Sequence, residues 1–228
     1  MAKKFEISMM GELKFFLGLQ VKQLADDIFV FQAKYIAYML KKYGFSDCKT
    51  AKTLMCPSAS FGANPNGTNV NEPLYRGKIG SLLYLTANYL DIMFATILYA
   101  CYQASPKESH LLVVKRIFRY LNYTPNLGLW YPRHSKFKLV GYTDSDHGGC
   151  GIDRKSTSGG VEMIGDRLVS WSSKMQTLVA CSTTEAEYVA IGRRCAQILW
   201  IQNKLLYYVL NFSKTPIYCY NTSSIHMI

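Results

Sequence analysis

The chain has 228 residues, of which 49% are hydrophobic and 18% charged, and its formal net charge is +11. This composition excludes an intrinsically disordered chain, and it leaves room for one large domain or two small ones with their own cores. The basic excess favours a polyanionic partner, because each neutralised phosphate releases condensed counterions. An anionic membrane surface is the main alternative.

Seven cysteines are spread along the chain without a Cys-x-x-Cys pair or a paired Cys/His spacing. This argues against a zinc site and a disulfide framework, and it fits a reducing compartment. The start, MAKKFEISMM, lacks an apolar stretch before a small-residue cleavage site, so no signal peptide is expected. We therefore expect an intracellular protein, cytoplasmic or nuclear, that is not secreted.

The first elements have the pattern of a hairpin followed by a helix. Residues 15–21 form one β-rich run, a turn follows at 25–27, and residues 28–31 form the return strand. From Lys34 to Tyr43 the apolar residues recur at helical spacing. Gly44 is placed to end that helix in a left-handed conformation.

An extended connector and a helical region are expected next. Residues 46–73 are rich in Asn, Gly, Pro and Ser and lack apolar periodicity. Residues 75–123 are predicted to be mostly helical with a break at Ser105-Pro106, because proline fixes φ and removes a backbone donor. The second piece, 108–121, is basic on one side through Lys115, Arg116 and Arg119. These cations fit either a solvated helix face or a surface that faces phosphates.

Residues 79–101 contain one charge, Asp91, over a length that could cross a bilayer. Thr86, Asn88 and Tyr89 lie near the middle of this stretch, where polar groups are costly in a membrane. We therefore expect a pair of helices and no membrane-spanning segment.

Strand-type patterns dominate the last third of the chain. Residues 123–135 hold two prolines and a glycine and predict a domain boundary. A strand is expected over 137–144, and a hairpin is expected from 161 to 171 around Gly165-Asp166. Ser182 to Glu185 reads as a capping box for a long helix toward Tyr207, and a short strand is expected at 217–220. The pattern predicts an α+β fold with helices on a mixed sheet.

Two acidic residues stand at positions suited to metal chemistry. Asp144 ends an apolar strand, and Glu187 lies in the first turns of the capped helix. Such rigid supports can hold two carboxylates near a pair of Mg²⁺ ions, as two-metal phosphodiester hydrolysis requires. The same residues also fit a turn-forming aspartate and a glutamate that interacts with the helix dipole.

Long motifs give the chain a specific resemblance. Three segments closely resemble the ribonuclease H part of Ty1/copia-type retrotransposon Pol polyproteins: GYTDSDHGGCGIDRKSTSGG (141–160), LVSWSSKMQTLVACSTTEAEYVA (168–190) and IYCYNTSSI (217–225). Three others resemble the region just after the reverse transcriptase active site: GELKFFLGLQV (11–21), LYRGKIGSLLYLTA (74–87) and PKESHLLVVKRIFRYL (106–121). The similarity covers nearly the whole chain.

The resemblance implies five segments. They are the palm-end hairpin and first thumb helix of reverse transcriptase (1–45), the extended connector (46–73), the helical thumb and connection (74–124), a linker (125–135) and a truncated ribonuclease H-like domain with an incomplete mixed sheet (136–228). The elements before the linker position nucleic acid and do no chemistry. The chain has no Tyr-x-Asp-Asp motif, and Asp26-Asp27 lies in a hairpin turn. At 88–91 the chain reads Asn-Tyr-Leu-Asp where the family reads Ser-Arg-Pro-Asp, so local packing is expected to differ.

The resemblance also implies Mg²⁺ ligands at Asp144 and Glu187. The family's third acid corresponds to Tyr220, and its fourth lies beyond Ile228. A neutral phenol does not offset the charge of Mg²⁺, and its bulk is expected to fill space that the ions need. Asp146 is expected to be a solvated turn carboxylate, although it could substitute as a ligand. Mg²⁺ is therefore expected not to bind productively.

Three functions stay open on these grounds. The first is a catalytically inactive Pol fragment that binds an RNA–DNA hybrid or other nucleic acid weakly through charge. The second is a weakly active, Mg²⁺-dependent hybrid ribonuclease that uses Asp144, Asp146 and Glu187. The third is a copy re-used as a non-catalytic interaction protein. An unpaired sheet edge near 217–220 also predicts self-association.

Overall fold

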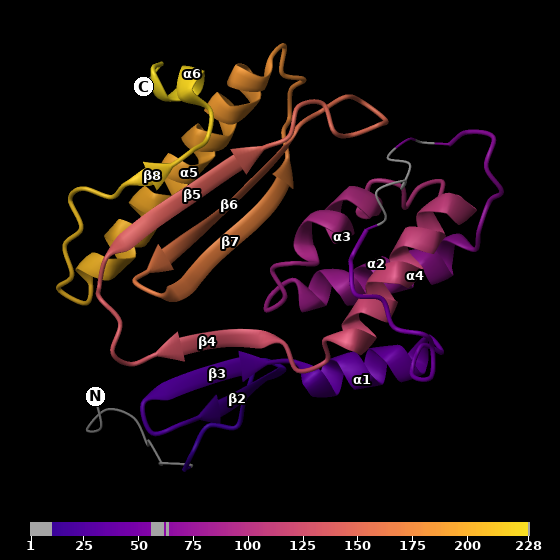
Figure 1. Cartoon of the computed structure of the whole chain (residues 1–228), viewed down its shortest axis with the longest axis horizontal. Coiled ribbons are helices and arrows are strands. Elements are labelled where there is room, and N and C mark those ends of the chain that lie inside the picture. Colours follow the sequence, from indigo (N-terminus) through magenta and orange to yellow (C-terminus); the bar gives the residue numbers. More distant parts are fainter. Residues whose placement is uncertain (1–10, 56–61, 63, 228) are drawn as a thin grey trace, which may run out of the picture.

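Figure 1 shows the computed structural model, which describes residues 11–55, 62 and 64–227. Residues 1–10, to which the prediction about a signal peptide refers, lie outside this description. Strands and helices combine in an α+β arrangement, and the predicted fold class is confirmed at that level. The elements are β1 (Phe15–Phe16), β2 (Leu19–Gln23), β3 (Asp27–Phe31), α1 (Ala33–Lys42), α2 (Glu72–Leu85), α3 (Met93–Ala100), α4 (Glu108–Tyr123), β4 (Gly128–Pro132), β5 (Leu139–Ser145), β6 (Thr157–Ile164), β7 (Arg167–Met175), α5 (Thr183–Leu206), β8 (Ile217–Tyr218) and α6 (Thr222–Ile225).

Helices α1 to α4 pack around the larger apolar core. On α4, the residues Val114, Ile117, Phe118 and Leu121 are fully buried and recur at the spacing that places them on one helix face. Helix α1 contributes a similar stripe, and its end is followed by Gly44 at φ +73°. The helical spacing predicted for α1 and α4 is therefore confirmed to within two residues at each end.

The helical region is interrupted twice, whereas the residue pattern of 75–123 predicted one break, at Ser105-Pro106. Besides the proline at 106, the chain leaves the helix between α2 and α3. There the buried Tyr89 donates its hydroxyl to the Thr124 carbonyl at 2.9 Å, and Asp91 accepts a hydrogen bond from Tyr120. These contacts tie the segment between α2 and α3 to the end of α4. Within the described part of the chain, no helix is both long and apolar enough to cross a membrane.

His110 connects the start of α4 to the connector. The Lys107 backbone N–H donates to Nδ1 of His110 at 3.1 Å, and Nε2 lies 3.1 Å from the Gly62 carbonyl oxygen. A neutral ring with its proton on Nε2 satisfies both contacts. The ring is fully buried and stacks on Tyr102, with 4.0 Å between the centroids. Burial lowers the pKa of His110, against the opposing effect of the Gly62 carbonyl.

We expect this histidine to make the fold sensitive to acid. Because its folded-state pKa is depressed, its contribution to stability is fully present above the unfolded pKa of about 6.5 and is lost as the pH falls through the folded value. The difference in unfolding free energy between wild type and His110→Gln should therefore shrink from pH 8 to pH 5. Urea titrations at both pH values measure it, and a constant difference would contradict the assignment.

The N-terminal hairpin is confirmed, but its first strand is divided. Strands β2 and β3 pair antiparallel from Gln20↔Phe31 to Gln23↔Ile28. The predicted single run 15–21 is wrong, because Leu17 and Gly18 have φ of +48° and +82° and turn the chain between β1 and β2. Tyr84 of α2 lies against this turn and donates its hydroxyl to the Leu17 carbonyl at 3.3 Å.

The segment 125–135, predicted as a linker, contains strand β4. It pairs antiparallel with β3 from Phe31↔Gly128 to Asp27↔Pro132 and completes a sheet of order β1-β2-β3-β4. The aromatic residues around Trp130 favour a strand, and this strand pairs with the edge of β3 that would otherwise be exposed. Pro132 stands at the end of the strand, where its missing N–H costs no ladder bond.

The second sheet has the order β7-β6-β5-β8, with α5 along one face (Figure 1). Strands β5, β6 and β7 are antiparallel neighbours, and β8 runs parallel to β5 at the edge. The predicted strand at 217–220 forms over two residues only. At the start of α5, the Ser182 hydroxyl caps the Glu185 N–H at 3.1 Å, while the Glu185 carboxylate accepts from the Cys181 N–H at 2.6 Å. The predicted contact of Ser182 is thus present, but the Glu185 carboxylate accepts from the N–H of Cys181 and not from that of the cap residue Ser182.

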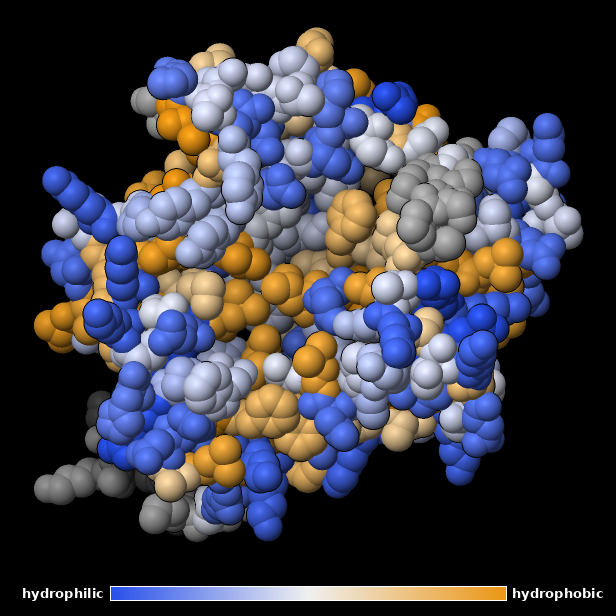
Figure 2. All heavy atoms as spheres, viewed as in Figure 1, coloured by the Kyte–Doolittle hydropathy of each residue, from blue (hydrophilic) through white to orange (hydrophobic). Residues whose placement is uncertain are grey.

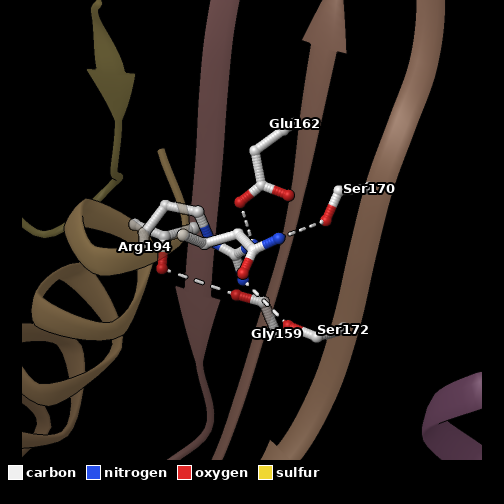
Figure 3. Close-up of polar contacts among 7 residues, drawn as sticks. Gly159, Glu162, Ser170, Ser172 and Arg194 are labelled. Carbon is white, nitrogen blue, oxygen red and sulfur yellow. Dashed lines mark hydrogen bonds and ion pairs between the residues drawn. The ribbon is translucent and has the colours of Figure 1, made fainter. Parts of the chain in front are cut away.

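Arg194 of α5 reaches across the sheet to Glu162 of β6, and Figure 3 shows this ion pair with the serines of β7 beside it. The helix can approach this closely because the sheet carries glycines beneath it. A Cβ on Gly141 would lie 2.7 Å from Cδ1 of Ile198, and a Cβ on Gly160 would lie 2.5 Å from Cζ of Arg194. The middle of α5 is therefore held close against β5 and β6.

Candidate functional site

Asp144 and Glu187 come together where β5 ends and α5 begins. Asp144 is exposed at the end of the strand, whereas Glu187 is only 6% exposed between the helix and the sheet. Burial raises the pKa of Glu187. A hydrogen bond from the Ser145 backbone opposes this rise, and the neighbouring Asp144 carboxyl adds to it. The structure thus places the two predicted ligands side by side.

A cysteine, which the sequence patterns did not single out, contacts the same carboxyl. The thiol of Cys219 donates to Oε2 of Glu187 at 3.6 Å, and its sulfur accepts from the Asn221 N–H at 3.4 Å. Burial raises the pKa of the Cys219 thiol, and the Glu187 and Asp144 carboxyls raise it further. The thiol therefore stays protonated at neutral pH and supplies no charge to a cation. In the sequence, only its position just before Tyr220 could have pointed to a place for Cys219 at this site.

Tyr220 lines the open hollow next to Asp144 without filling it. Its side chain is 95% exposed, so the expectation that its bulk fills the metal position is wrong. The reason is local: β8 ends at Tyr218, and Asn221 already caps α6 through a 2.9 Å bond from the Ser224 N–H. The chain turns between these two residues, and Tyr220 points outward at the turn.

Asp146 has a structural contact of its own. Its carboxylate accepts a hydrogen bond from the Thr157 backbone N–H at the start of β6. Burial raises the pKa of Asp146, while the Thr157 bond lowers it and the Asp144 charge raises it. The carboxylate is half-buried and closes the 146–157 loop, which differs from the solvated turn carboxylate that the sequence suggested.

These groups do not fit a two-ion magnesium site. Such a site needs several hard oxygen ligands whose negative charge offsets both ions. Two carboxylates meet here, and the third neighbour is a protonated thiol. In the described ranges, no group of three or more His, Cys, Asp and Glu side chains is arranged to hold a metal ion.

The three cations predicted as a phosphate-facing surface have different surroundings. Nε of Arg116 donates to the Thr53 carbonyl oxygen at 3.0 Å and so ties the connector to α4. The Arg119 carbonyl accepts from the Ala51 N–H at 3.1 Å, while the Arg119 side chain is exposed. Lys115 is half-buried. Arg119 is thus the most accessible of the three.

Comparison with known proteins decides the family. The chain is 33% identical over 229 aligned residues to the retrovirus-related Pol polyprotein from transposon RE1 of Arabidopsis thaliana, and the alignment covers the whole chain. The chain belongs to the Ty1/copia-type retrotransposon Pol family. The resemblance inferred from its motifs is therefore confirmed.

Other members of the Pol family and one shorter protein are similar over most of the chain. The Pol polyprotein from transposon RE2 of the same plant is 30% identical over the whole chain. An uncharacterized mitochondrial protein of Arabidopsis thaliana is 31% identical over 88% of the chain and 83% of its own length. The chain spans 16% of the RE1 and RE2 polyproteins. No family model matches the chain, and no solved structure matches it.

Proposed function

We propose that this copia-type Pol segment carries a ribonuclease H-like domain that does not hydrolyse RNA–DNA hybrids, preceded by thumb and connection elements of a reverse transcriptase. The order β5-β6-β7-α5-β8 with Asp144 and Glu187 at adjoining ends supports the domain assignment. The loss of hydrolysis rests on one observation. The third position near these carboxylates holds the protonated Cys219 thiol, and the neighbouring Tyr220 points into solvent.

The missing charge is the physical reason for inactivity. Two-metal hydrolysis uses one ion to generate hydroxide and the other to stabilise the leaving oxygen, and both ions need carboxylate ligands. Burial and the neighbouring Asp144 carboxyl raise the pKa of Glu187. Asp146 is committed to the Thr157 N–H, which argues against its recruitment as a substitute ligand in a weakly active enzyme.

We expect wild type to leave the RNA strand of an RNA–DNA hybrid intact in Mg²⁺, and Tyr220→Asp to cleave it. Position 220 lines the same hollow as Asp144, so an aspartate there adds a third carboxylate to that hollow. The gain over wild type should be on the order of 100-fold or more, since bound metal supplies several kcal/mol to the transition state.

The matched control is Tyr220→Asn, which has nearly the same size as aspartate and no charge, and it should stay silent. Cleavage by wild type that disappears in Asp144→Asn would overturn the proposal in favour of the weakly active enzyme. Silence of Tyr220→Asp as well would uphold inactivity but refute position 220 as its cause.

Residual nucleic-acid affinity is the second part of the proposal, and the charge of +11 supports it. With about three phosphates neutralised, affinity for a hybrid should fall about 40-fold between 50 and 200 mM salt. Arg119→Gln should reduce the salt slope by about one, because its exposed side chain can reach a phosphate. Arg116→Gln should leave the slope unchanged, because that guanidinium is bonded to Thr53. Fluorescence anisotropy measures both slopes, and a flat salt response would contradict the proposal.

A further inference from the structure

The face of the second sheet opposite α5 carries tyrosines next to Asp144. Along β5, Gly141 faces α5, so the alternation of side chains turns Tyr142 and Asp144 to the other face. Tyr142 is paired with Tyr218 of β8, and their rings stack with 5.3 Å between centroids and 25° between planes. Tyr220, at the turn between β8 and α6, lines the same hollow as Asp144. All three tyrosine side chains are exposed.

Two hollows meet at Asp144 on this face. One, of about 500 Å³, is lined by the three tyrosines together with Asp144. The other, of about 380 Å³, runs from Asp144 toward Met93 and Phe94 at the start of α3. Figure 2 shows apolar side chains gathered on the molecular face between the sheet and the helices. We call the joined hollows the tyrosine groove.

The charge of the tyrosine groove is opposite to that of the chain as a whole. Among the described residues that line it, the only charged ones are Asp144 and Asp146, and no Lys, Arg or His contributes. A phosphate backbone would find no counter-charge there. A cation would find the carboxylate of Asp144 beside aromatic faces, which attract positive charge through their quadrupoles.

We propose that the tyrosine groove binds the guanidinium group of an arginine side chain in a peptide segment. A guanidinium is planar and weakly hydrated, so it can stack on the ring of a tyrosine while its N–H fork donates to a carboxylate. The exposed rings of Tyr142 and Tyr218, stacked on each other, line the hollow next to Asp144 and offer aromatic surface there. The compact ammonium group of a lysine stacks less well on an aromatic ring, and it lacks the fork of donors that matches the two oxygens of a carboxylate. The proposal does not depend on whether the domain hydrolyses RNA.

The test uses a fluorescein-labelled Gly-Gly-Arg-Gly-Gly peptide and its citrulline analogue, which keeps the shape of arginine without the charge. Polarisation titrations on the full chain, without Mg²⁺ or nucleic acid, should give at least about tenfold weaker binding for citrulline, because charge-assisted hydrogen bonds are lost. Asp144→Asn should weaken arginine binding by a similar factor. Tyr220→Ala should weaken it about threefold, as expected for an exposed cation–π contact.

The matched control is Tyr207→Ala, which removes a tyrosine that is 82% exposed just after α5, outside the residues that line the groove. It should leave the peptide affinity unchanged. Equal binding of the arginine and citrulline peptides would overturn the proposal, and so would equal losses in Tyr220→Ala and Tyr207→Ala. A single-stranded oligonucleotide that binds through Tyr220 while the peptide does not bind would also overturn it. Because no hybrid is present, the result is separate from that of the cleavage assay.

Discussion

Replacing Arg194 by methionine is expected to lower the free energy of unfolding by about 3–5 kcal/mol, because it leaves a buried carboxylate without its counter-charge. Glu162 on β6 is fully buried and Arg194 on α5 is 4% exposed. The guanidinium also donates to the Ser172 hydroxyl at 3.1 Å, on the next strand (Figure 3). The pair therefore links the helix to two strands of the sheet.

The exposed ion pair between Lys155 and Asp153 provides the matched control, since about a third of each side chain is accessible. Lys155→Met should cost less than about 1 kcal/mol. The double variant Glu162→Leu, Arg194→Met should recover much of the loss, because no charge stays buried. Urea denaturation followed by tryptophan fluorescence gives all three values. An Arg194→Met loss no larger than that of Lys155→Met would show that the buried pair has no special role.

Local patterns predicted the helices well for a physical reason. The apolar spacing of α4 and the Ser182 cap of α5 depend on residues within a turn or two of each other, so the sequence contains them directly. Strand β4 could not be found this way, because it forms only where the distant β3 offers an unpaired edge. The same holds for the segment between α2 and α3, where Tyr89 bonds to a carbonyl 35 residues further along the chain.

The features of the candidate site also divide into those that have a local sequence signal and those that depend on distant parts of the chain. Asp144 and Glu187 could be proposed because each stands at the end of an element that has its own sequence signal. The Cys219–Glu187 contact and the outward direction of Tyr220 depend on where β8 stops, and a two-residue strand leaves no periodicity to read. The tyrosine groove requires the β5–β8 register, which joins residues 76 positions apart.

Replacing Gly160 by alanine is expected to lower the free energy of unfolding by about 1–3 kcal/mol, the usual cost of overpacking a filled site. The new methyl group would lie 2.5 Å from Cζ and 2.6 Å from Nε of Arg194, so the buried guanidinium must move. Gly159→Ala is the matched control on the same strand. Its methyl group would face the other side of the sheet, 3.8 Å from the Asp144 carbonyl oxygen, and should change stability by less than about 1 kcal/mol.

A double-variant cycle separates steric crowding from the loss of the ion pair. If Gly160→Ala destabilises the protein by displacing Arg194, the substitution should cost much less in an Arg194→Met background, where the flexible methionine can move aside. The coupling between the two positions should then be about 1 kcal/mol or more. Additive losses would mean that the methyl group disturbs the backbone of β6 independently of Arg194. In that case, Gly160 would be needed for the conformation of β6, and the close packing of α5 against the sheet would have another cause.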